Sequence, residues 1–66
     1  MKSSNENIKT TLQIVDFLIA LADKGDLERE DVGCGILYGI VRDSAYKIKR
    51  AAESEMTVHI RMGKWS

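Results

Sequence analysis

The sequence predicts an all-α fold, an antiparallel two-helix hairpin that assembles as a four-helix-bundle-like dimer or as a higher oligomer. Three observations lead to this prediction. Apolar residues recur at heptad spacing in both halves of the chain, as in helices that pack along their length. The 66 residues contain no proline, so nothing blocks long helices. A single short connection near Gly25 and Asp26 joins the halves, which is typical of an antiparallel pair.

The first helix is expected over about 4–24. Ser3 followed by Glu6 has the spacing of a capping box at its start. Lys24 and Gly25 suit its end, because a cation stabilises the last carbonyls and glycine adopts the left-handed conformation there. The apolar residues form a heptad seam and a second stripe beside it, which together cover about half the circumference and need more than one packing partner. The seam is Ile8, Leu12, Val15, Ile19 and Ala22, and the stripe is Ile14, Leu18 and Leu21.

The second helix is expected from about 27 or 32 to 62, with Asp26 or Asp31 as its N-cap and a short tail over 63–66. One continuous apolar face is predicted, made of Cys34, Leu37, Val41, Ala45, Ile48, Ala52 and Met56. Residues 56–62 also fit the alternation of a strand, but a lone strand would need another chain to pair with. Helix is the favoured interpretation, with Gly63 at the C-cap.

Association follows from size. A chain this short buries only about 60% of its unfolded surface, so a monomer is marginally stable. One cysteine, Cys34, closes no intrachain disulfide, and Cys34 with His59 is too small a set for structural zinc. Self-association is therefore the expected source of extra stability, and no metal or other cofactor is expected. The predicted oligomer interface is Ile8, Leu12, Val15, Leu18, Ile19, Leu37, Val41, Ile48 and Met56.

The charge balance argues against a dedicated nucleic-acid or membrane binder. Ten basic and ten acidic residues cancel, so no global field attracts phosphates. The first 31 residues carry four bases and seven acids, whereas residues 32–66 carry six bases and three acids, a dipolar arrangement that suits antiparallel or head-to-tail packing. Residues 1–11 lack the apolar region of a signal peptide, and the apolar stretch 14–22 is short of the roughly 20 residues of a membrane span. We expect a cytoplasmic protein.

Two surfaces of the second helix are candidate binding sites. The first is a smooth face for a partner protein, where glycines allow close approach; the alternatives are a loosened first turn or packing against the first helix or another subunit. Its residues are Gly35, Gly39, Arg42 and Tyr46. The second is a basic segment that could contact phosphates, with a partly balanced solvent-exposed face as the alternative. Its residues are Arg42, Lys47, Lys49 and Arg50.

Catalysis is not expected, because two helices offer little concavity and no nucleophile–base pair or phosphate loop is present. His59 has no Cys, Asp or Glu partner in the sequence pattern and is interpreted as a solvated helix histidine. The leading hypothesis is a non-catalytic homo-oligomer that acts as a protein-interaction adaptor or regulator. The alternatives are a nucleic-acid-binding regulator and a purely structural assembly subunit.

The layout resembles the Rop type of bundle, in which two helical hairpins dimerise into a four-helix bundle. The likeness rests on length, a short linker and heptad spacing. Rop-type proteins include an RNA-binding regulator, but no sequence motif is shared. No residue role is therefore carried over from that group.

Overall fold

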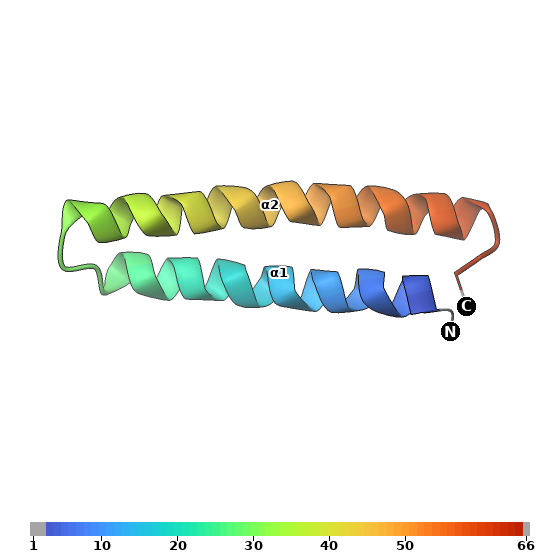
Figure 1. Ribbon diagram of the computed structural model, residues 1–66, viewed down its shortest axis with the longest axis horizontal. Helices are drawn as coiled ribbons and strands as arrows, with labels where there is room; N and C mark the ends of the chain where they lie inside the picture. The colour runs from blue at the N-terminus through green and yellow to red at the C-terminus, as the bar shows by residue number, and fades with distance from the viewer. Residues whose placement is uncertain (1–2, 66) are drawn as a thin grey trace.

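The computed structural model describes residues 3–65, which form two antiparallel helices and no strand. Helix α1 spans Ser3–Leu27 and helix α2 spans Val32–Arg61. The two lie side by side along their whole length, joined by a four-residue connection over 28–31 (Figure 1). The predicted all-α hairpin is therefore confirmed at the level of one chain.

Helix α1 continues past the glycine at which it was expected to end. Gly25 is helical, and the last helical residue is Leu27. The ring of Tyr38 from α2 fills the space that a β-carbon at Gly25 would occupy. The glycine thus lets a tyrosine pack against the backbone, and the prediction that it forms a left-handed C-cap is wrong.

Asp31, and not Asp26, is the N-cap of α2. Its backbone is extended, and its carboxylate accepts a hydrogen bond from the Cys34 amide at 2.7 Å. This bond satisfies one of the amide groups that the first helical turn leaves without an internal partner. It also lowers the pKa of Asp31, because the hydrogen bond favours the ionised carboxylate.

Residues 56–61 belong to α2, which ends at Arg61 with Met62 as its C-cap, so the strand alternative is wrong. The helix ends in a Schellman motif. Gly63 has a φ of 69°, its amide donates to the Ile60 carbonyl, and the Lys64 amide donates to the His59 carbonyl at 2.8 Å. The predicted glycine cap is confirmed here, and it turns the tail back toward the start of α1 (Figure 1).

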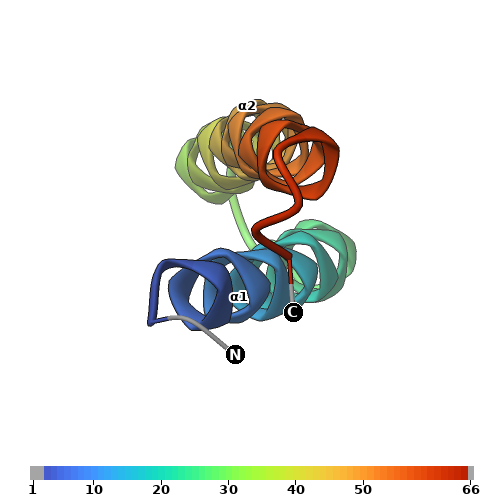
Figure 2. The ribbon, with the colours of Figure 1, turned by 90° about the vertical axis from the view of Figure 1, so that its right-hand side faces the viewer.

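The core is the narrow seam between the two helices, which is seen end-on in Figure 2. Its buried apolar residues are small: Val15, Ala22, Ala45 and Ala52. Small side chains allow two helices to approach closely, which increases dispersion contacts along their length. No third element covers either helix in the described part of the chain, whose Cα atoms measure 48 × 16 × 13 Å.

The face that α2 presents to α1 differs from the predicted one. Ala45, Ala52 and Met56 lie in the seam as expected, but Leu37 and Ile48 are exposed to solvent. Their expected places are taken by half-buried residues that recur at heptad spacing. These are Gly35, Tyr38, Arg42, Lys49 and His59. The helix is therefore rotated relative to the prediction, and its largest apolar side chains lie beside the seam.

Candidate functional site

The rotation of α2 creates one mostly apolar side of the hairpin. In both helices, the residue immediately before a seam residue lies on one flank of the helix, and the residue immediately after it lies on the other. Two antiparallel helices are related by a two-fold axis, so the preceding flanks of α1 and α2 fall on the same side of the hairpin. We call this the apolar side, and its apolar members in the middle and loop half are Ile14, Leu18, Leu21, Leu37, Val41 and Ile48.

Most of the apolar side is open to solvent. Ile14 is 54% exposed, Leu37 is 51% exposed, and Leu21 and Ile48 are each 40% exposed. Leu18 and Val41 are half-buried between these residues and the seam. Scattered exposed apolar residues are normal on a protein surface, whereas a contiguous patch marks an interaction surface.

The opposite flanks form a side with mixed charge, which we call the charged side. It carries Lys9, Asp16, Asp23, Asp43, Tyr46, Arg50 and Glu53. At its edge, the Arg42 guanidinium crosses the seam and donates to the Asp23 carboxylate at 2.8 Å. This hydrogen bond raises the pKa of Arg42. The ion pair links the two helices near the loop, although its solvent exposure limits its contribution to stability.

The structure separates the four residues predicted to bind a partner protein. Gly35 and Arg42 belong to the seam: a β-carbon at Gly35 would meet the Arg29 side chain, and Arg42 pairs with Asp23. Gly39 and Tyr46 lie on the charged side, where nothing is within 4 Å of a β-carbon at Gly39. Two of the four residues of the predicted partner-binding face, Gly35 and Arg42, thus take part in contacts within the hairpin.

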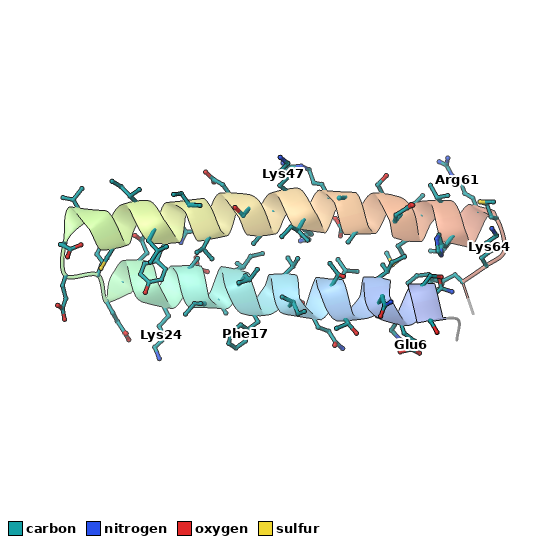
Figure 3. All side chains as sticks on the ribbon, in the orientation of Figure 1. Glu6, Phe17, Lys24, Lys47, Arg61 and Lys64 are labelled. Carbon is teal, nitrogen blue, oxygen red and sulfur yellow. The ribbon has the colours of Figure 1, made fainter. Side chains whose placement is uncertain are left out.

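The four predicted nucleic-acid-binding residues do not form one patch. Besides the paired Arg42, Lys49 is half-buried at the seam, with its ammonium 5.9 Å from the centre of the Tyr46 ring. Lys47 projects directly away from α1 (Figure 3), and Arg50 lies on the charged side. The nucleic-acid interpretation stays a prediction, with Lys47 and Arg50 as its accessible cations.

The predicted oligomer interface divides into two groups. Val15 is buried between α1 and α2, and the half-buried members at seam positions line the same interhelical contact. These half-buried members are Ile8, Leu12, Ile19 and Met56. The remaining four, Leu18, Leu37, Val41 and Ile48, lie on the apolar side. The first group thus takes part in the contact within the hairpin, whereas the second group lies beside that contact.

A polar cluster at the open end of the hairpin was missed by the sequence interpretation. Asn5 is completely buried and donates from Nδ2 to the Lys64 carbonyl at 2.5 Å. Its Oδ1 lies 2.5 Å from Nδ1 of His59, so His59 carries a proton on that nitrogen and donates it. The expectation that His59 is a solvated helix histidine is wrong, because the side chain is half-buried and bonded to Asn5. The heptad register offered the signal, since Asn5 stands three residues before Ile8.

The remaining surface offers little concavity. The larger depression lies at the connection and is lined by Arg29, Glu30, Asp31, Val32, Gly35 and Ile36. There, Arg29 pairs with Asp26 and Asp31 caps α2. Within residues 3–65, no three His, Cys, Asp or Glu side chains are grouped as a metal site requires. Over the same residues, neither helix is long and apolar enough to cross a membrane.

Compared with known proteins, the chain matches no family model, no curated protein and no solved structure at a significant level. The two sides of the hairpin are therefore the features that bear on function. Of the two, the apolar side has the clearer physical reason to bind another molecule, because burying its aliphatic groups away from water is favourable.

Proposed function

We propose that this protein works by binding and not by catalysis, as a small helical homo-oligomer that serves as an interaction adaptor or regulator. The observation that carries the proposal is the apolar side, where aliphatic residues from both helices lie exposed and adjacent. Fully burying one such side chain contributes about 1.5–3 kcal/mol. Burying these six partly exposed side chains would therefore favour association between chains.

In this proposal the charged side remains outward after self-association and meets a partner protein. Gly39 provides a flat position without a side chain, and Tyr46 provides a large ring that is 43% exposed. Tyrosine is enriched in protein interfaces because it buries a large area with little loss of conformational entropy. The mixed charges around it favour a protein surface over a polyanion, since affinity for phosphates needs a net positive patch.

Two neighbouring residues give a matched test of the apolar side. Leu37→Asp places a carboxylate on this side, whereas Ile36→Asp places the same group on the charged side, since Ile36 immediately follows the seam residue Gly35. The parent residues are similarly exposed, at 51% and 60%. Because a buried unpaired charge costs several kcal/mol and each 1.4 kcal/mol is a tenfold change, Leu37→Asp should weaken association by at least about 100-fold. Ile36→Asp should change it by less than about threefold.

Analytical ultracentrifugation of both variants over a range of concentrations measures this difference, and circular dichroism checks that helicity is retained. Two folded variants that associate as strongly as the wild type would refute the assignment of the apolar side. Equal weakening by both would mean that the charged side of α2 also forms the contact.

A further inference from the structure

The open end of the hairpin is closed by a chain of hydrogen bonds that passes through one buried side chain. Nδ1 of His59 donates to Oδ1 of Asn5, and Nδ2 of Asn5 donates to the Lys64 carbonyl. The Lys64 amide in turn donates to the His59 carbonyl at 2.8 Å. Asn5 thus joins the first turn of α1 both to the last turn of α2 and to the tail that follows it.

The tail crosses from the end of α2 to α1 at this end of the molecule (Figure 2). The left-handed conformation of Gly63 turns the chain in this direction. Trp65, the one tryptophan of the sequence, is half-buried. Its position depends on that of Lys64, because the two residues are adjacent in the chain. Release of the tail would therefore expose a large indole ring to water.

The side chain of Asn5 is completely buried, so water does not replace its hydrogen bonds while the end stays closed. Among the residues that the structure describes, no buried side-chain nitrogen or oxygen lacks a partner. Moving the tail away removes the acceptor of Nδ2, and moving α2 away removes the donor to Oδ1. Either change leaves half of the amide unpaired until water enters. The tail and the ends of both helices therefore stabilise one another.

This cluster is separate from the contacts that hold the rest of the hairpin together. Near the loop, Arg42 of α2 pairs with Asp23 of α1. The middle of the seam contains buried apolar residues such as Val15 and Ala45, whose packing does not involve the Asn5 amide. Helix ends with few buried apolar contacts open more readily than the middle of a packed structure. The open end of the hairpin can therefore separate while the middle stays folded.

We propose that Asn5 is the positioning residue of a clasp, in which the tail, the last turn of α2 and the first turn of α1 close and open together. In the closed state Asn5 holds the Lys64 carbonyl, and Trp65 is half-buried. In the open state these hydrogen bonds are lost and Trp65 is exposed to solvent, while the rest of the hairpin stays helical. The clasp is a property of one chain and does not depend on the self-association proposed above.

Two matched variants test the clasp at equal protein concentration. Asn5→Ala deletes the buried amide group, whereas Asn7→Ala deletes the same group from an exposed position of α1. The loss of two hydrogen bonds shifts the equilibrium toward the open state by roughly tenfold or more. In Asn5→Ala, hydrogen exchange of the Lys64 amide should be faster by this factor. Emission of Trp65 should also move to longer wavelength and be quenched more strongly by acrylamide, whereas Asn7→Ala should match the wild type.

The imidazole of His59 provides a second readout, which the wild type itself can give. Donation to Oδ1 of Asn5 requires that the neutral ring carries its proton on Nδ1. Two-dimensional ¹H–¹⁵N NMR at about pH 8.5, where an imidazole is neutral, distinguishes this tautomer from the one protonated on Nε2. The Nδ1–H tautomer should predominate in the wild type and in Asn7→Ala, and its share should fall in Asn5→Ala.

Several results would overturn the clasp. If Trp65 of the wild type is quenched as strongly as in the urea-unfolded chain, or if His59 is protonated on Nε2, the end is not closed. Unchanged Lys64 exchange and Trp65 emission in Asn5→Ala would show that the tail closes without the amide. Equal changes in Asn7→Ala would assign the effect to α1 in general. Loss of helicity along the whole chain in Asn5→Ala, seen by circular dichroism, would exclude a local opening.

Discussion

Gly25 and Gly39 lie inside helices, but they have opposite surroundings. A β-carbon at Gly25 would overlap the Tyr38 ring, whereas a β-carbon at Gly39 would meet nothing within 4 Å. Neither residue has a positive φ, so alanine is conformationally allowed at both. The two positions therefore separate the cost of overpacking from the gain in helix propensity.

Gly25→Ala should destabilise the protein by about 1–3 kcal/mol, because the Tyr38 ring must move out of its contact with α1. Gly39→Ala should stabilise it by up to about 1 kcal/mol, because alanine has the higher helix propensity. Urea unfolding followed by circular dichroism measures both changes. Stabilisation by Gly25→Ala would show that Tyr38 does not pack on α1, and destabilisation by Gly39→Ala would show that another surface covers Gly39.

At the scale of one element, the N-cap of α2 is the carboxylate of Asp31, whose pKa is lowered in the folded state. The Cys34 amide donates to the Asp31 carboxylate and lowers its pKa below the ordinary value of 3.8. A carboxylate with a lowered pKa in the folded state stabilises that state above the unfolded pKa. The stabilisation is lost as the pH falls through the folded value. Protonation of Asp31 therefore removes the charged cap and loosens the first turn of α2.

Asp31→Asn should remove this contribution while keeping a neutral cap, because asparagine also accepts the amide hydrogen bond. The wild type should melt at a higher temperature than the variant at pH 7, and the difference should shrink as the pH is lowered below 3.8. Melting temperatures of both proteins measured from pH 2 to 7 check this. A difference that stays constant with pH would mean that the Asp31 charge does not stabilise the helix.

Most boundaries of the elements could be predicted from the sequence, because local signals determine them. Asp31 and Gly63 cap α2 in positions where their side chain or backbone is favoured, and heptad spacing identifies both helices. The end of α1 could not be predicted in the same way. Glycine is the residue type expected at a helix C-cap, but the role of Gly25 depends on its contact with Tyr38, which is distant in sequence.

The face by which α2 contacts α1 was also not predictable from apolar periodicity. Counting large aliphatic residues places Leu37 and Ile48 in the seam, whereas the structure places Arg42 and Lys49 there. Long cationic side chains can lay their methylene groups along a neighbouring helix while the charge reaches water. Small residues such as Ala45 then allow close approach, and this tertiary packing outweighs the burial of larger side chains within one hairpin.

At the scale of the whole molecule, the two helices bury a core between them, but within residues 3–65 no element packs on the apolar side. This side was anticipated in part: Leu18, Leu37, Val41 and Ile48 were expected at an oligomer interface and lie on it. Ile14 and Leu21 complete it, and they were visible in the sequence as a second stripe on the first helix. Their juxtaposition with residues of α2 depends on the rotation of that helix, which heptad spacing alone does not determine.

The proposed burial of the apolar side by a second copy would link folding to association. If folded chains associate and unfolded chains do not, mass action raises the melting temperature as the protein concentration increases. The most direct test is thermal unfolding of the wild type over a 100-fold dilution series, from about 2 to 200 μM. Self-association predicts a melting temperature that rises steadily with concentration, by several degrees over the series. Cooperative unfolding at one temperature across all concentrations, from a species with the 7.4 kDa mass of a single chain, would contradict self-association.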